Sequence, residues 1–224
     1  MSASVVLVHG FATDSARTWR DNGWLDLLGD VGRQAAPIDL LGHGTAAKPH
    51  DPEAYADMEA LVAAQLPEGP VDAIGFSLGA RVLLTLACDH PDRFERLVLT
   101  GVGANLLRSE GSDLILRAVE GEGDPTNPVV QYFAGLASHP DVDREALSAC
   151  LRSPRPPLTP ERLAAVQIPV LVILGDKDFA GPGEPLVEAL PNARLVSLRN
   201  VDHFATPKDF GCIDAALDFL GAGL

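Results

Sequence analysis

A glycine-flanked serine is the first residue in this sequence whose setting points to chemistry. Residues 75–79 read Gly-Phe-Ser-Leu-Gly; they follow the apolar run Val71–Ile74 and lead directly into a segment with helical spacing. A G-x-S-x-G turn between a strand and a helix reverses the chain tightly and places the serine hydroxyl at the end of the sheet. We therefore take Ser77 as the candidate nucleophile, against the alternative that the turn is only structural.

A serine hydroxyl is a poor nucleophile at neutral pH and needs a base within hydrogen-bond reach. Of the six histidines, His203 is the one that falls on a loop between the last apolar run and the terminal helix. His9 and His43 also follow strand ends, but a neighbouring glycine turn accounts for each, and we expect them to make loop hydrogen bonds. The others stand at helix boundaries and are expected at the surface: His50, His90 and His139. His203 is thus the predicted general base and, later, general acid.

Six short apolar runs could position these groups. They comprise residues 4–8, 71–75, 97–100, 170–174, 194–198 and, more weakly, 35–39, where Pro37 makes a strand doubtful. Runs without polar alternation are typical of strands buried on both faces, as in a parallel sheet covered by helices. In such a sheet, ligands bind beyond the carboxyl ends of the strands, where Ser77 and His203 are expected.

The segments between these runs have the spacing of amphipathic helices. We expect helices over residues 24–31, 51–66 and 80–87, and a terminal helix that opens at Thr206 and carries Phe210, Ile213, Leu217 and Leu220 on one face. Strand–helix alternation predicts an α/β fold with right-handed crossovers.

One interval breaks this alternation. About seventy residues between Leu99 and Val170 contain no convincing strand, which is too long for a plain crossover. We expect a core formed by residues 1–103 and 168–224 and a small helical lid formed by residues 104–167, lying over the strand ends. The alternative is that the insertion is extra scaffold.

Composition excludes several classes of protein. The chain has 224 residues, of which 46% are hydrophobic and 21% are charged, so it is long enough and apolar enough for one folded domain. Seventeen basic residues against 31 acidic ones give a net charge of −14, which argues against nucleic acid as a partner. The sequence has no metal-binding motif and no phosphate-binding glycine loop, so no metal and no cofactor are expected.

The three cysteines are widely spaced, which fits a reducing compartment. The sequence shows no signal peptide and no membrane-spanning run, so we expect a cytoplasmic protein that does not bind a membrane. The oligomeric state is left open.

Five motifs, in the same order along the chain, resemble those of the α/β-hydrolase family, and together they extend from His9 to His203. They are His-Gly-Phe at 9–11, Asp-Leu-Leu-Gly-His-Gly at 39–44, the serine turn at 75–79, Gly-Asp-Lys-Asp at 175–178 and Asp-His-Phe at 202–204. The resemblance implies that fold, with about six mostly parallel strands flanked by helices and without the family's two N-terminal strands. The chain order Ser, Asp, His is the one expected for it.

The resemblance also implies the remaining catalytic groups. Asp178 fits the position of the acid that orients His203, although Asp176 on the same turn remains possible; Asp202 adjoins the histidine and is disfavoured. Backbone N–H groups of Phe11 and Leu78 would form the oxyanion hole.

Four aromatic residues are candidates for substrate binding. Phe76, Phe179 and Phe204 adjoin the expected site in sequence, and Phe133 lies in the insertion where it could close the roof. The alternative is that they only pack the loops. The sequence shows no arginine clamp, which makes strongly anionic substrates less attractive.

The leading hypothesis is a serine hydrolase that cleaves small, apolar carboxylic esters through an acyl-enzyme at Ser77. The same residues could instead serve thioester, lactone or carbon–carbon hydrolysis, a lyase reaction, or a low-turnover ligand sensor. Dehalogenase and epoxide hydrolase activities are disfavoured, since the related enzymes carry aspartate where Ser77 stands.

Overall fold

A parallel sheet of six strands forms the centre of the computed structural model, which describes residues 4–108 and 112–221. The strand order is β2-β1-β3-β4-β5-β6, and each neighbouring pair is parallel. The strands are β1 (Ser4–Val8), β2 (Gln34–Ile38), β3 (Val71–Phe76), β4 (Phe94–Thr100), β5 (Val170–Gly175) and β6 (Ala193–Leu198). This confirms the expected fold class. The doubtful run that contains Pro37 is the edge strand β2, where a missing backbone donor is tolerated.

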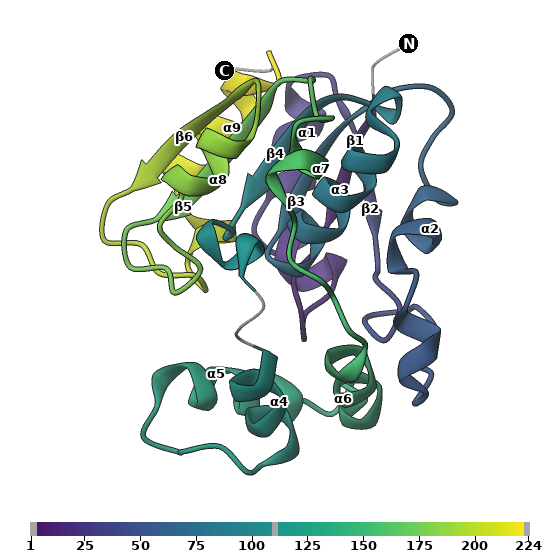
Figure 1. Ribbon diagram of the computed structural model, residues 1–224, viewed down its shortest axis with the longest axis vertical. Helices are drawn as coiled ribbons and strands as arrows, with labels where there is room; N and C mark the ends of the chain where they lie inside the picture. The colour runs from purple at the N-terminus through teal and green to yellow at the C-terminus, as the bar shows by residue number, and fades with distance from the viewer. Residues whose placement is uncertain (1–3, 109–111, 222–224) are drawn as a thin grey trace.

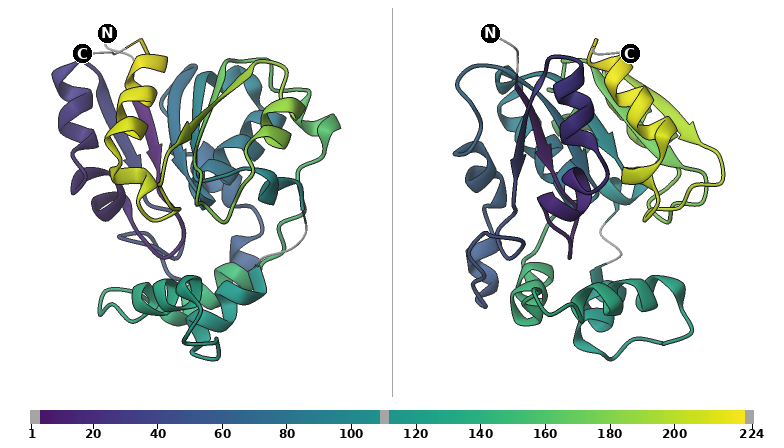
Figure 2. Two further views of the ribbon diagram at one scale, coloured as in Figure 1. Left: turned by 90° about the vertical axis from the view of Figure 1, so that its left-hand side faces the viewer. Right: turned by 180° about the vertical axis from the view of Figure 1, so that it is seen from behind.

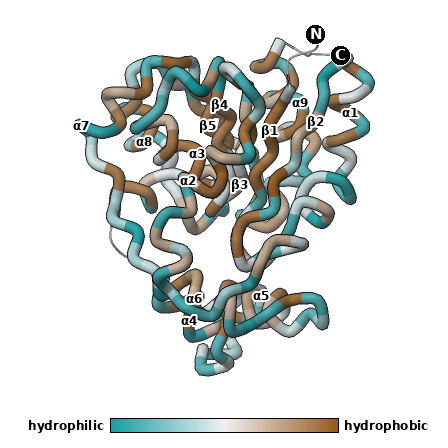
Figure 3. The backbone as a smooth tube through the Cα atoms, turned by 90° about the vertical axis from the view of Figure 1, so that its right-hand side faces the viewer, coloured by the Kyte–Doolittle hydropathy of each residue, from teal (hydrophilic) through white to brown (hydrophobic). Residues whose placement is uncertain are grey.

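Alternate residues of the central strands pack into two separate hydrophobic layers. In β1, Val6 and Val8 join one layer, while Val5 and Leu7 join the other, and all four are fully buried. In Figure 3 the central strands β1 and β5 are accordingly coloured mostly brown, the hydrophobic end of the scale. Burial on both faces explains why the sequence shows continuous apolar runs rather than alternation.

Helices cover both faces of this sheet. Residues of α1 (Trp24–Asp30) and α9 (Phe210–Phe219) pack in one layer, and Figure 2 shows these two helices on the same side. The other layer contains residues of α2 (Met58–Ala63), α3 (Leu78–Asp89) and α8 (Glu184–Ala189).

Two of the helices expected from the sequence are shorter in the structure. The segment 51–66 forms a 3-10 turn over Pro52–Tyr55 and then α2, because the Asp57 side chain accepts a hydrogen bond from the Ala60 amide and starts a new helix. The terminal segment likewise forms a 3-10 turn over Thr206–Lys208 before α9, which Asp209 caps.

The expectation that Phe210 shares the buried face of the terminal helix is wrong. Its side chain is 86% exposed, whereas Ile213 and Ala216 are buried. Phe210 is the first residue of α9, and the buried residues of this helix begin only at Cys212 and Ile213.

The insertion forms three helices grouped at the carboxyl end of the sheet. They are α4 (Ser112–Glu120), α5 (Pro128–Ala137) and α6 (Arg144–Arg152), and they contact one another through α4. Figure 1 shows them apart from the sheet, while the start of β1 and the end of α9 lie at its opposite end. The short helix α7 (Pro160–Leu163) packs back against α3. Residues 109–111 of the expected insertion lie outside the described residues.

An ion-pair cluster fastens the end of the sheet far from the insertion. The buried carboxylate of Asp72 in β3 accepts hydrogen bonds from Arg96 Nε at 2.9 Å and Nη2 at 3.1 Å, and from Arg33. Both arginines also donate to backbone carbonyls at the end of α9. The cluster therefore ties β3, β4 and the residue before β2 to the end of α9.

The cysteines Cys88, Cys150 and Cys212 are buried free thiols. Within residues 4–108 and 112–221, no helix combines the length and apolar character needed to cross a bilayer. The same residues contain no group of three or more His, Cys, Asp or Glu side chains placed to hold a metal ion.

Candidate active site

Ser77 occupies a strained turn between β3 and α3. Its backbone has φ 51° and ψ −110°, a conformation that residues other than glycine rarely adopt. The flanking glycines permit this turn. A Cβ at Gly75 would lie 2.6 Å from the backbone of Ala80, and one at Gly79 would lie 2.2 Å from the carbonyl oxygen of Val8. The hydroxyl of Ser77 is thereby fixed at the carboxyl end of the sheet.

The structure joins Ser77, His203 and Asp178 in one chain of hydrogen bonds. Ser77 Oγ lies 3.0 Å from His203 Nε2, and His203 Nδ1 lies 2.9 Å and 3.0 Å from the two carboxylate oxygens of Asp178. The Nδ1–H group can donate only to the carboxylate, which leaves Nε2 to accept from the serine hydroxyl. This is the geometry that a general base requires.

The acid and the base are shielded from water. His203 is 3% exposed and Asp178 is 9% exposed. The amide of Ala180 donates to Asp178 Oδ1 at 2.8 Å and so fixes the carboxylate. The ring of His203 contacts those of Phe76 and Phe179, at centroid distances of 5.0 Å and 4.3 Å. Apolar walls exclude water and strengthen the hydrogen bonds within the chain.

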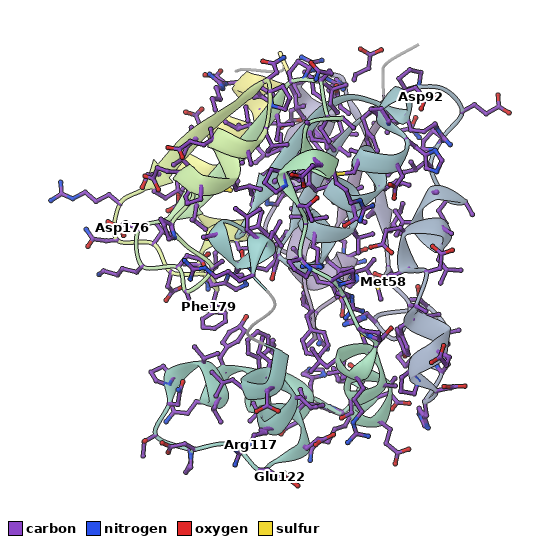
Figure 4. All side chains as sticks on the ribbon, viewed as in Figure 1. Met58, Asp92, Arg117, Glu122, Asp176 and Phe179 are labelled. Carbon is purple, nitrogen blue, oxygen red and sulfur yellow. The ribbon has the colours of Figure 1, made fainter. Side chains whose placement is uncertain are left out.

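The two other candidate acids are engaged elsewhere. Asp176 is exposed, and its Oδ1 accepts from the amide of Asn200 at 2.7 Å. Asp202 Oδ1 accepts from the amides of Phe204 and Ala205. In Figure 4, Asp176 lies at the outer edge of its loop, while Phe179 on the same loop is directed toward the insertion helices. The structure thus brings only Asp178 of the three to His203.

The candidate oxyanion donors follow the ends of the neighbouring strands β1 and β3. Leu78 is the first residue of α3, and Phe11 follows β1 after Gly10, where a Cβ would lie 2.7 Å from the ring of Phe76. Within the described residues, neither the Phe11 amide nor the Leu78 amide donates a hydrogen bond to another protein group. Both N–H groups are therefore available to a bound oxygen.

Buried polar side chains hold the Phe11 loop. His9 Nδ1–H donates to the carbonyl of Gly10 at 2.7 Å, and its Nε2 accepts from the amide of Leu40 at 3.0 Å. These two bonds occupy both ring nitrogens of the neutral imidazole. Burial lowers the pKa of His9. Asp39 accepts from the amides of Ser15 and Thr45; although partial burial opposes it, these hydrogen bonds lower the pKa of Asp39 to about 2.

His43 also packs against this loop. Its ring centroid lies 5.3 Å from that of His9 and 5.5 Å from that of Phe11, and it is 3% exposed. Nδ1–H donates to the carbonyl of Leu41 at 2.9 Å, while Nε2 has no partner among the described residues. Burial, together with the neighbouring His9, lowers the pKa of His43 to about 3. The imidazole is therefore neutral and serves as packing.

A cavity of about 210 Å³ opens beside Ser77 and His203. One part of its wall is apolar, and its aromatic and aliphatic members are Phe11, Phe76, Tyr132, Phe133, Leu136 and Phe204. Of the four aromatic candidates for substrate binding, Phe76, Phe133 and Phe204 line the cavity. Phe179 is not among its lining residues and is 47% exposed, although it contacts the ring of His203.

Sequence reasoning missed a polar part of the wall. Arg17 and Lys208 line the cavity, so the site has cationic side chains beside it although the sequence shows no arginine clamp. Tyr132 was also missed; its ring stacks on Phe204 with centroids 3.4 Å apart. The sequence offered one indication of these two cations, which is their position: Arg17 follows the Phe11 loop, and Lys208 follows His203 by five residues.

Comparison with known proteins identifies similar chains. The sequence model of the alpha/beta hydrolase family matches residues 5–210. A pimeloyl-acyl-carrier-protein methyl ester esterase of Neisseria meningitidis is 34% identical over 198 aligned positions, covering 74% of this chain and 74% of the relative. A putative 2-succinyl-6-hydroxy-2,4-cyclohexadiene-1-carboxylate synthase of Bacillus subtilis is 26% identical, covering 95% and 89%. The crystal structure of an enol-lactonase from Burkholderia xenovorans has the same fold, with a TM-score of 0.70, 22% identity and coverage of 99% and 92%.

The buried, neutral His43 predicts a loss of stability in acid. Above pH 6.5 the imidazole is neutral in both the folded and the unfolded chain. As the pH falls below 6.5, His43 becomes protonated in the unfolded chain, whereas in the folded chain it stays neutral down to about pH 3. Between pH 8 and pH 5.5 this single group should cost about 1.4 kcal/mol of unfolding free energy.

Urea denaturation of the wild type and of His43→Asn at both pH values measures this cost. The drop in free energy between pH 8 and pH 5.5 should be smaller in the variant by about that amount. The same change at the exposed His90 should leave the drop unchanged. Equal drops in the wild type and in His43→Asn would contradict the burial account.

Proposed function

This chain belongs to the alpha/beta hydrolase family, and from that premise we propose that it is a serine esterase working through an acyl-enzyme at Ser77. The observation that carries the proposal is the hydrogen-bonded chain from Ser77 through His203 to Asp178. The three groups come from separate strand ends, and their order and contacts match the requirements of an activated nucleophile.

The first half of the reaction forms the acyl-enzyme. Ser77 Oγ attacks the ester carbonyl carbon while His203 Nε2 takes the hydroxyl proton. Asp178 keeps the imidazole in the required tautomer and stabilises the imidazolium. When the tetrahedral intermediate collapses, the carbon–oxygen bond to the alcohol breaks, and His203 returns the proton to the departing alcohol oxygen.

The second half hydrolyses the acyl-enzyme. Water attacks the acyl carbon as His203 Nε2 accepts its proton, and the acid leaves as Ser77 Oγ recovers a proton from the imidazolium. In both halves the negative carbonyl oxygen accepts hydrogen bonds from the amides of Phe11 and Leu78. Losing one such donor costs about 3 kcal/mol of transition-state stabilisation in comparable sites.

Two observations support an ester of a small acyl chain as the substrate. The cavity is small and carries an apolar wall of aromatic residues. The relative from Neisseria meningitidis, at 34% identity, is named a methyl ester esterase, whereas the relative named a synthase is 26% identical. We also propose that α4–α6 act as a lid, because Phe133 and Leu136 of α5 form part of the cavity wall.

Replacing the nucleophile tests the proposal. On p-nitrophenyl esters from acetate to decanoate, the wild type should prefer short to medium chains, because the cavity is small. Ser77→Ala should lower kcat/KM at least about 10³-fold, because the attacking oxygen is lost. An unchanged thermal unfolding curve would show that the variant is folded, and substantial turnover by it would refute the acyl-enzyme. Acyl thioesters and lactones, assayed in parallel, would identify a different target bond.

A matched pair of variants tests the acid. Asp178→Asn should lower kcat by roughly 10⁴-fold, because the amide favours the wrong imidazole tautomer. Asp176→Asn removes the same charge two residues away, at an exposed position that does not contact His203, and should stay within a few-fold of the wild type. Equal losses in the two variants would be incompatible with the assignment of Asp178.

A further inference from the structure

The polar part of the cavity wall is cationic. It is formed by the segment after β1 and by the 3-10 turn Thr206–Lys208, and it contains Thr13, Arg17, Thr18, Asn22 and Lys208. Neither an aspartate nor a glutamate is among the described residues that line the cavity. The chain as a whole has 31 acidic and 17 basic residues and is negatively charged. This part of the wall, with two cations and no carboxylate, therefore has the opposite sign of charge.

The charge of Arg17 is already balanced within the protein. Its Nε lies 3.5 Å from Asp14 Oδ2, and its Nη2 lies 3.7 Å from Asp141 Oδ2. Nη2 also donates to His139 Nδ1 at 2.7 Å. Arg17 therefore joins the core to the loop between α5 and α6, and its guanidinium is held by partners from both sides.

Lys208 is different, because its ammonium has no carboxylate or carbonyl partner among the described residues. The backbone beneath it is nevertheless firmly held. The Lys208 amide donates to the carbonyl of Ala205 at 3.1 Å, and the carbonyl of Pro207 accepts from the indole Nε1 of Trp24 at 2.6 Å. Trp24 is fully buried, and Thr206 Oγ1 donates to the carbonyl of Asp202 at 3.0 Å. Lys208 thus lines the cavity from a fixed turn, and it is exposed to solvent.

We propose that Lys208 binds a carboxylate at the far end of the ester substrate, so that the substrate class is the monoester of a dicarboxylic acid. This inference rests on the proposed function of Ser77. The ester group would lie at Ser77 and the methylene chain along the aromatic wall. The ammonium of Lys208 then donates hydrogen bonds to the carboxylate. A single uncompensated cation matches a singly charged anion better than a phosphate, which carries nearly two charges.

The test compares charged and neutral esters of equal length. The charged probes are monomethyl succinate, adipate and suberate; in the neutral probes a primary amide replaces the carboxylate. The wild type should prefer the charged ester at one chain length, because the chain must span from Ser77 to Lys208. Lys208→Gln should lower kcat/KM for that ester about tenfold, equivalent to 1.4 kcal/mol, chiefly through KM, and leave the amide series unchanged.

Two further variants and the ionic strength give the controls. Lys208→Arg should restore the preference, since it restores the cation. Arg20→Gln removes one positive charge from an exposed residue outside the cavity and should have no effect, which separates the local contact from the net charge. The preference of the wild type should weaken as salt screens the partly exposed pair. A Lys208→Gln variant that affects the charged and amide esters equally, or affects neither, would overturn the proposal.

Binding to Ser77→Ala separates this proposal from the proposed function. Calorimetric titration of Ser77→Ala with the preferred monomethyl ester should give about tenfold tighter binding than the same titration of Ser77→Ala/Lys208→Gln. Such binding without any ester turnover by the wild type would support the carboxylate site and refute the esterase. Turnover of neutral esters without Lys208-dependent binding would refute the carboxylate site and leave the esterase standing.

Discussion

The turn at Ser77 is the constraint on which the rest of the site depends. A serine with positive φ at the end of a strand stores backbone strain, which persists only where the surroundings leave the chain no alternative. Here β3 is buried between β1 and β4, and α3 starts at the very next residue. Gly75 and Gly79 allow helix and strand to approach to distances that no side chain would permit. The fold thereby holds a reactive hydroxyl in one place without using its side chain for support.

The surroundings of that hydroxyl keep each histidine in a definite state. His203 has a carboxylate on one nitrogen and a hydroxyl on the other, which is the arrangement that the proposed general base needs. His9 and His43 are buried with lowered pKa values, and they shape the Phe11 loop as neutral rings. Histidines at this sheet edge therefore have different partners: His203 bonds the side chains of Asp178 and Ser77, whereas His9 and His43 bond backbone groups.

Much of this arrangement could be predicted from the sequence, because it is encoded locally. Each group of the Ser77–His203–Asp178 chain lies within five residues of the end of an apolar run, and the carboxyl ends of parallel strands meet at one edge. The edge of the sheet at which the three groups lie could therefore be predicted, but the distances between them could not.

The features that were missed depend on tertiary packing. Arg17 and Lys208 are separated by almost the whole chain, and they line one cavity because the π-helical turn Ala16–Arg20 packs against the 3-10 turn Thr206–Lys208. Nothing in the local sequence of either residue signals a shared cavity. The exposure of Phe210 likewise depends on where the Asp209 cap starts the last helix. The sequence pattern specified the strand ends well, but it did not specify which distant side chains would share a wall.

The central claim is that Ser77 becomes acylated, and trapping that species is its most direct test. The protein would be mixed with p-nitrophenyl hexanoate, quenched in acid within one turnover, and measured by intact-protein mass spectrometry with peptide mapping. The account predicts a mass increase of one hexanoyl group in the wild type, located on the peptide that contains Ser77, and no such increase in Ser77→Ala. An acyl group on another residue, or ester turnover without any acylated protein, would contradict it.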